Sequence, residues 1–294
     1  MRSFALASAL AVAGVVNAGP TTTEKDLPKR AEALPTVTAS GNAFFAGDNR
    51  FYVRGIDYQP GGSSANIDPL ADTKICSRDI PKFKELGVNT IRVYSVDNAK
   101  DHQDCMQQLN DAGIYLVLDI NNPEYSIRRD KPAQSYNAEY LQSIFAAIDE
   151  FQKYDNTLAF FSGNEVINDE EGSTRTAPFV KATTRDMRQY IAERGYRKIP
   201  VGYSAADVSE NRMQTAHYFN CGSDFERSDF FAFVSDAALS FVHFSKVANH
   251  VLERLLVVRS LELPEIRLGR QGQELHWIRS AYLPVRVGLH HQPP

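Results

Sequence analysis

The stretch from residue 89 to residue 119, NTIRVYSVDNAKDHQDCMQQLNDAGIYLVLD, contains the pattern that decides the fold of this chain. Residues 90–94 and 114–119 are short runs of β-branched, aromatic and aliphatic side chains, typical of buried strands. Residues 101–112 have the spacing of an amphipathic helix, and Gly113 follows where a left-handed C-cap residue belongs. Strand, helix and strand in this order predict a βαβ unit with parallel strands.

The same alternation extends in both directions along the chain. It predicts further strands at residues 51–57, 157–162, 199–203 and 229–233, and further helices at 78–86, 136–154 and 177–194. An open doubly wound sheet is the alternative, but no glycine-rich phosphate-binding fingerprint follows any of these strands. We therefore predict an α/β fold, a (β/α)8 TIM-type barrel that is incomplete, with about six βα units in residues 42–233.

The N-terminal segment has the features of a targeting signal. Arg2 precedes an apolar run, and the small residues of Val16-Asn17-Ala18 end it, which predicts a signal peptide over residues 1–18 and a secreted chain. A buried N-terminal helix is the alternative. The run is too short to span a bilayer, which takes roughly 20 residues. Residues 19–41 are predicted to be a polar linker, in which Lys29-Arg30 is either a processing site or solvated.

Composition and charge restrict the class of partner. The formal net charge is -4 and the pI about 6.0, so no basic field favours nucleic acid, and a neutral substrate fits better. The histidines lack the spacing of a metal site beside carboxylates or thiols, so we expect no metal and no cofactor.

Polar residues follow most of the predicted strands, where the active site of a barrel is built. These residues are Gln59, Tyr94, Asp119, Asn121, Asn164, Glu165 and Tyr203. In Asn164-Glu165, the amide can bind a sugar hydroxyl and the carboxyl can act as a general acid. A helix N-cap with an acid in the first turn is the alternative for this pair. Ordinary core packing is the alternative for Tyr94 and Tyr203.

Five segments, in the same order, resemble the fungal β-1,3-glucanosyltransferases of glycoside hydrolase family 72. They are GIDYQPGG (55–62), NTIRVYSVD (89–97), LDINNPE (118–124), FSGNEVIN (161–168) and VGYSAAD (201–207). The resemblance implies a retaining barrel enzyme that cleaves a β-1,3-glucan and transfers the glycosyl group to another glucan. It also implies a glycoprotein at the cell wall or outer plasma membrane, with a C-terminal GPI anchor; no hydrophobic tail follows Gly288.

The resemblance assigns roles to the candidate residues. Glu165 matches the general acid/base, and Asn164 matches the amide that contacts the sugar 2-hydroxyl. Gln59, Tyr94 and Asp119 match donor-subsite residues, and Tyr203 is a weaker substrate-binding candidate; the position of Asn121 after its strand adds it to this set. The family also pairs Cys76 with Cys105 and joins Cys221 to a partner further along the barrel. Here Cys221 is left unpaired, or is a buried free cysteine.

The expected nucleophile is missing from the sequence. The family carries its second glutamate in a Ser-Glu-Tyr-Gly-Cys context after a late strand, and no such segment occurs here. Residues 234–294 differ in composition from the rest of the chain, although the apolar run 255–258 is compatible with a strand. Residues 283–289 are compatible with codons for the missing segment in another frame, so we predict a divergent tail that results from a frameshift or a missed splice boundary near Val234.

Three hypotheses follow for the function. The chain is a β-1,3-glucanosyltransferase, a non-catalytic glucan-binding remnant that keeps the donor cleft, or an inactive product that lacks the nucleophile. Elongated products from a reduced laminari-oligosaccharide would favour the first, and binding without turnover the second. Failure to obtain soluble protein would favour the third.

Overall fold

The structure is a computed structural model that describes residues 34–41, 43–62, 64–235, 238–242 and 256–258. All of these residues lie in one compact unit, Met1–Leu261. The predicted signal peptide and most of the predicted tail fall outside the described residues.

The helices and strands alternate as the sequence predicts. The strands are β1 (Val37–Ser40), β2 (Ala43–Ala46), β3 (Asn49–Phe51), β4 (Gly55–Asp57), β5 (Thr90–Val93), β6 (Tyr115–Asp119), β7 (Thr157–Asn164), β8 (Val201–Ala206), β9 (Phe230–Ser235), β10 (Ala238–Val242) and β11 (Leu256–Val258). The helices are α1 (Thr73–Glu85), α2 (Gln103–Asp111), α3 (Pro132–Ser135), α4 (Ala138–Phe151), α5 (Ala177–Glu193) and α6 (Arg212–Asn220), with a 3-10 turn, η1, at Ser173–Thr176.

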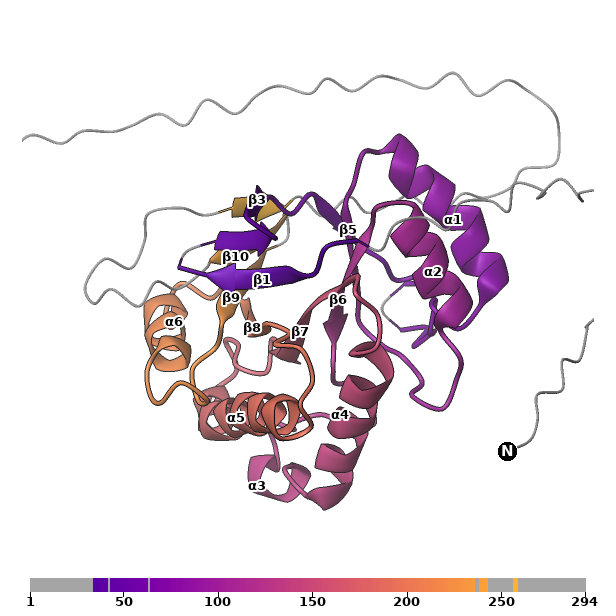
Figure 1. Ribbon diagram of the computed structural model, residues 1–294. Coiled ribbons are helices and arrows are strands. Elements are labelled where there is room, and N and C mark those ends of the chain that lie inside the picture. The colour runs from indigo at the N-terminus through magenta and orange to yellow at the C-terminus, as the bar shows by residue number, and fades with distance from the viewer. Residues whose placement is uncertain (1–33, 42, 63, 236–237, 243–255, 259–294) are drawn as a thin grey trace, which may run out of the picture. The chain divides into compact units, whose positions relative to one another are not determined.

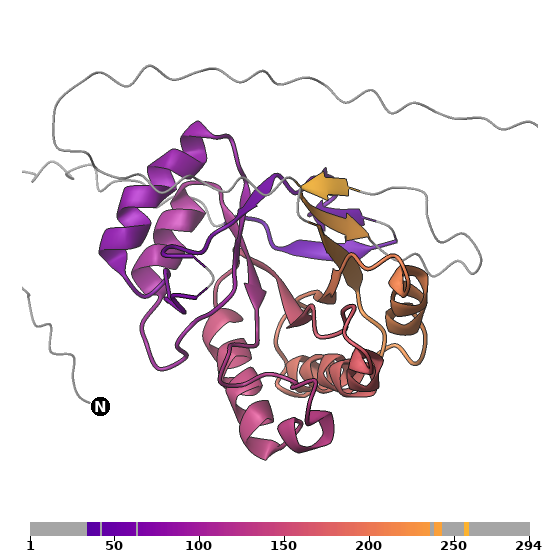
Figure 2. The ribbon, with the colours of Figure 1, turned by 180° about the vertical axis from the view of Figure 1, so that it is seen from behind.

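Six parallel strands form the centre of the structure. The main sheet has the order β11-β10-β9-β8-β7-β6-β5-β4, and every neighbouring pair from β4 to β9 is parallel. This confirms the predicted partial barrel of about six βα units (Figure 1). Strands β10 and β11 are antiparallel to their neighbours, so they extend the sheet without continuing the barrel pattern. Figure 2 shows the same sheet from behind.

The two faces of the sheet bury different partners. Side chains alternate along each strand, so Leu116 and Leu118 pack on the helices while Tyr115 and Val117 face the other way. The helix side forms the larger apolar core. On the other side, the sheet packs against the antiparallel strands β1, β2 and β3. We call these the helix face and the inner face.

The predicted linker is too long at its C-terminal end. Strand β1 lies within residues 19–41 and pairs with β2 from Val37 to Ser40. The Val37 side chain is 0% exposed and packs on the inner face. The folded unit thus begins before Asn42. Strand β1 was not predicted, because a short strand in a polar surrounding gives little signal in the sequence.

Other predicted elements shift at their ends. The predicted strand 51–57 divides into the end of β3 and all of β4, and the predicted helix 136–154 corresponds to α4. Helix α6 was not predicted because its sequence, RMQTAHYFN, lacks clear amphipathic spacing, although Thr215, Ala216 and Phe219 are buried. Gly113, predicted to cap α2, has φ of 75°, a conformation that glycine adopts without steric cost.

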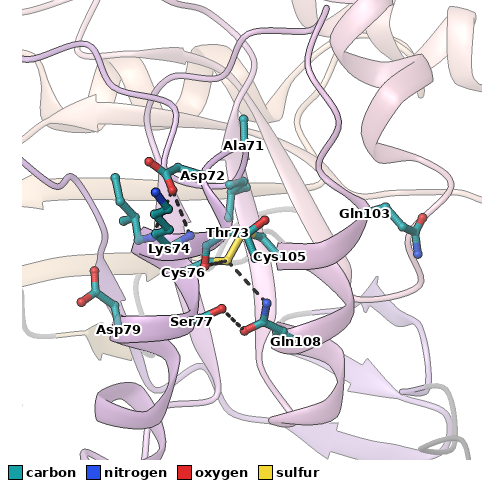
Figure 3. Close-up of a disulfide and its surroundings, with 12 residues drawn as sticks. Ala71, Asp72, Thr73, Lys74, Cys76, Ser77, Asp79, Gln103, Cys105 and Gln108 are labelled. Atoms are coloured by element: carbon teal, nitrogen blue, oxygen red, sulfur yellow. Dashed lines mark hydrogen bonds between the residues drawn. A yellow bond between two sulfur atoms is a disulfide. The ribbon is translucent and has the colours of Figure 1, made fainter.

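One disulfide joins helices α1 and α2, which pack on the main sheet (Figure 3). Cys76 on α1 is bonded to Cys105 on α2, with a Cα–Cα distance of 5.8 Å. Beside it, Ser77 Oγ donates to Gln108 Oε1 at 2.8 Å. Cys221 is exposed and has a free thiol. Among the described residues, no helix has the length and apolar character that crossing a membrane requires.

Candidate active site

The C-terminal ends of neighbouring parallel strands bring polar side chains to the inner face. Arg92 on β5 lies between Ile91 and Val93, which face the helices, so Arg92 faces inward. The register pairs Asp57 with Arg92, and pairs Asn164 on β7 with Ser204 on β8. Both pairs therefore lie at the C-terminal ends of the parallel strands, with β6 between them.

A network centred on a buried arginine connects four neighbouring strands, β5, β6, β7 and β8. Arg92 Nε and Nη2 donate to the two oxygens of Asp119 at 2.9 and 2.7 Å, a bidentate ion pair. Arg92 Nη2 also donates to Asn164 Oδ1 at 3.0 Å, and Ser204 Oγ donates to the same oxygen at 2.8 Å. We call Arg92, Asp119, Asn164 and Ser204 the Arg92 cluster.

The Arg92 cluster is buried and charged. Arg92 is 3% exposed and Asp119 4% exposed. Burial alone would lower the pKa of Arg92, but the attraction of Asp119 outweighs it and holds the pKa above its usual value. Arg92 Nη1 is buried and lacks a hydrogen-bond partner among the described residues. This nitrogen, with its two N–H groups, thus remains able to donate to a further acceptor.

Aromatic rings border the same guanidinium. Arg92 Cζ lies 4.3 Å from the ring centroid of Tyr94 and 4.5 Å from that of Phe161. Burial, and then the nearby Asp57 carboxyl, outweigh the opposing effect of Arg92 and raise the pKa of Tyr94 above its usual value. Tyr94 therefore keeps its phenolic proton at neutral pH and can donate a hydrogen bond.

Glu165 follows the last residue of β7 in a strained conformation. Its φ is 48°, in the left-handed region that costs an L-residue roughly 1–2 kcal/mol. The main chain around it is fixed, since Glu165 N donates to Ser204 O at 2.8 Å and Arg129 Nη2 donates to Glu165 O at 2.6 Å. Strain of this kind concentrates at functional sites. It also takes Glu165 out of the alternation of β7.

The remaining predicted site residues are not all brought together. Gln59 is half-buried in the turn after β4, where its carbonyl accepts from Gly62 N at 3.0 Å. Asn121 Nδ2 donates to Tyr140 OH at 2.8 Å, which ties its amide to α4. The structure therefore places Tyr94, Asp119 and Asn164 around Arg92, and leaves Asn121 directed toward the helices.

Tyr203 occupies a packing position behind the site. Its side chain is 0% exposed and its ring stacks on Phe219 at 4.4 Å. The hydroxyl accepts from Ile167 N at 3.0 Å, and burial raises its pKa above the usual value. Tyr203 thus lies on the helix face and supports, from there, the segment that carries Glu165. This position agrees with core packing, the alternative that its sequence left open.

Three residues of the site were missed in the sequence, namely Arg92, Ser204 and Arg129. The signal for Arg92 was present: a charged residue between Ile91 and Val93 in a buried strand requires an ionic partner. Arg129 lies in the loop after β6 and carries no such signal. Its contacts depend on the path of two loops, which local patterns do not determine.

Known proteins match this chain over most of its described length. A family model described as glucanosyltransferase, glycoside hydrolase family 72, matches residues 27–237. The 1,3-beta-glucanosyltransferase gel1 of Aspergillus fumigatus is 63% identical over 234 residues, 79% of this chain and 50% of that protein. The 1,3-beta-glucanosyltransferase gas4 of Schizosaccharomyces pombe is 58% identical over 199 residues, 67% of this chain and 43% of that protein. The chain thus spans about half the length of the curated relatives it matches.

A solved structure is similar in both sequence and fold. Gas2p of Saccharomyces cerevisiae, in complex with laminaritriose and laminaritetraose, has a TM-score of 0.64 and 42% sequence identity. The match covers 68% of this chain and 45% of that one.

Proposed function

Because the chain belongs to the glucanosyltransferases of glycoside hydrolase family 72, we propose that it carries the donor side of a 1,3-β-glucanosyltransferase. Its substrate is a β-1,3-glucan, cleaved internally and transferred to the end of another glucan with retention of configuration. Glu165 is the general acid/base. Tyr94, Asp119, Asn164 and Gln59 belong to the donor subsite, with Asn121 and Tyr203 behind it.

The Arg92 cluster supports the role of Asn164. Its side-chain oxygen already accepts from Arg92 Nη2 and Ser204 Oγ, so both lone pairs of that oxygen are used. The amide is thereby fixed with its NH2 group as the part that can donate to a sugar hydroxyl. A neutral amide donor suits an uncharged substrate. The buried ion pair keeps this amide in its orientation before the ligand binds.

The chemistry proposed for Glu165 is that of a retaining glycosidase. Its carboxyl protonates the leaving glycosidic oxygen while a second carboxylate attacks the anomeric carbon and forms a glycosyl ester. The Glu165 carboxylate then removes the proton of an acceptor hydroxyl, which attacks the ester and releases the second carboxylate. The two carboxyls of such enzymes lie roughly 5–5.5 Å apart. The second carboxylate is not assigned to a described residue of this chain.

One observation carries the proposal. The similar structure of Gas2p holds laminaritriose and laminaritetraose, which are β-1,3-linked glucose oligomers, and its match covers 68% of this chain at 42% sequence identity. We further propose that the protein is a secreted glycoprotein of the fungal cell wall or outer plasma membrane, held there by a lipid anchor as the family resemblance implies.

Product analysis with a reduced laminari-oligosaccharide tests the proposed function. Transfer requires the second carboxylate, so products longer than the substrate would show that the wild-type chain supplies it. E165Q should then lower the rate of transfer by roughly 100-fold or more. E193Q, which changes an exposed glutamate at the end of α5, is the matched control and should transfer as the wild type does.

The outcomes separate the hypotheses. Oligosaccharide binding without turnover in the wild type would contradict transfer and favour a glucan-binding protein. Transfer that E165Q leaves unchanged would contradict the assignment of Glu165.

A further inference from the structure

A single side chain from the loop after β6 holds the segment that carries Glu165. Arg129 Nη2 donates to Glu165 O at 2.6 Å, and Arg129 Nε donates to Val166 O at 3.0 Å. The third guanidinium nitrogen, Nη1, donates to Glu170 Oε1 at 2.8 Å. All three nitrogens of the guanidinium thus bind acceptors within residues 165–170.

The other side of the same segment is held by β8 and α6. Glu165 N donates to Ser204 O at 2.8 Å, and Ile167 N donates to Tyr203 OH at 3.0 Å. Asn211 Nδ2, next to the start of α6, donates to Asn168 O at 3.1 Å. Arg129 therefore completes the attachment of this segment from the side opposite β8.

The bond to Glu165 O acts on the strained residue itself. A left-handed conformation at a non-glycine residue persists only when its surroundings determine it. Glu165 N is fixed by Ser204 and Glu165 O by Arg129, so both peptide groups of this residue have partners from other elements. Loss of the Arg129 bond would allow the carbonyl to turn and the residue to relax toward the extended conformation of β7.

We propose that Arg129 is a positioning residue for the general acid/base. It acts through the main chain of Glu165 and fixes the direction in which the carboxyl leaves the end of β7. The proposal rests on the proposed function, because it concerns the acid/base of that reaction. A planar guanidinium with several fixed donors can bind two successive carbonyls and a carboxylate, whereas a lysine ammonium provides one point of attachment.

Because Arg129 is partly exposed, its role can be tested by substitution without disturbing the core. Its side chain is 37% exposed, so replacement removes hydrogen bonds without opening a core cavity. The neighbouring Arg128 has a side chain that is 65% exposed and pairs only locally with Asp130, at 3.1 Å. R128Q is therefore a matched control for R129Q, with the same chemical change one residue away.

The first measurement is amide hydrogen exchange of residues 164–170 in the full chain, without ligand. R129Q should increase exchange at Val166 and Ile167 by about 10-fold, R129K by less, and R128Q should leave it unchanged. Equal protection in R129Q and wild type would overturn the proposal, whatever the activity of the protein.

The second measurement is steady-state transfer with a laminari-oligosaccharide. R129Q should lower kcat by about 10- to 100-fold, because a small misplacement of a catalytic group has effects of this size. KM should stay within about threefold, and R129K should recover part of the loss. An aryl β-laminaribioside, whose phenolate leaves with little need of protonation, should release its phenol at a rate closer to wild type.

The outcomes distinguish this proposal from the proposed function. Unchanged kcat in R129Q, or an equal loss on both substrates, would overturn the positioning role. Wild-type protein that neither binds nor converts the oligosaccharide would contradict the proposed function instead. Equal exchange in R129Q and wild type would overturn the positioning role in that case too.

Discussion

Two buried ionic clusters lie on opposite faces of the parallel sheet. The Arg92 cluster faces inward at the ends of β5 to β8. The second cluster, which we call the His102 cluster, consists of Asp68, His102 and Glu150 on the helix face. His102 is 0% exposed, and its two ring nitrogens each lie 2.9 Å from a carboxylate oxygen, of Asp68 and of Glu150. Both clusters join elements that are far apart in the sequence.

The His102 cluster is closed by its own surroundings. Asp68 also accepts from the main-chain amides of Leu70, Ala71 and Asp97. Glu150 also accepts from Lys153 Nζ at 2.8 Å and Tyr154 OH at 3.1 Å. Each carboxylate thus has several donors besides the imidazole, as expected of a cluster that fixes the loop after β4 to α2 and α4.

The Arg92 cluster differs because it is incomplete. Arg92 Nη1 lacks a partner among the described residues, and Asn164 is fixed through its oxygen alone. A buried donor without a partner costs free energy, roughly 1–3 kcal/mol, unless a ligand or another group satisfies it. The difference supports the proposed binding of glucan at the Arg92 cluster, whereas the closed His102 cluster fits a structural role.

The largest effect is expected from breaking the Arg92 cluster. R92M leaves the Asp119 carboxylate buried without its ion-pair partner, which should lower the free energy of unfolding by about 3–5 kcal/mol. Urea unfolding measures the loss. The double variant R92M/D119L should recover most of it, because no unpaired charge remains. A loss below about 1 kcal/mol in R92M would contradict the central role of this ion pair.

A smaller effect is expected from the His102 cluster. H102Q should lower the free energy of unfolding by about 2 kcal/mol in the same urea experiment, since Asp68 and Glu150 keep their other donors. Should H102Q prove more destabilising than R92M, the distinction between a closed and an incomplete cluster would be wrong.

The pH dependence of stability sharpens the same comparison. Burial opposes the charged form of His102, but the hydrogen bonds and charges of Asp68 and Glu150 outweigh it and raise the pKa above 6.5. The stabilisation is therefore complete below about pH 6.5 and is lost as the pH rises through the raised pKa of the folded state.

The measurement is the difference in unfolding free energy between wild type and H102Q across this range. It should decrease by at most about 1.4 kcal/mol per pH unit. A difference that grows with pH would show that the imidazole is held neutral.

Much of the fold could be predicted because each parallel strand is a short apolar run next to an amphipathic helix. Strands β5, β6 and β7 all appear within a few residues of their predicted positions. Strand β1 and helix α6 could not be predicted, because their burial depends on contacts with distant elements: Val37 packs on the inner face of the sheet, and Phe219 packs on Tyr203.

The site could be predicted where a polar residue ends a strand. Asp119 and Asn164 both contact Arg92, because β6 is the parallel neighbour of β5 and of β7. The direction of Asn121 could not be predicted, since β6 ends at Asp119 and the alternation of side chains ends with it. The contact between Arg129 and Glu165 joins two loops, whose paths no local pattern specifies.

The binding of laminaritetraose to wild type, N164A and H102Q, measured by calorimetry below the unfolding transition of each, tests the central claim most directly. Loss of one hydrogen bond held by a charged cluster should weaken binding to N164A by about 10-fold. H102Q should bind within about twofold of wild type. Absence of binding to the wild type, or equal affinities for wild type and N164A, would contradict the assignment of glucan binding to the Arg92 cluster.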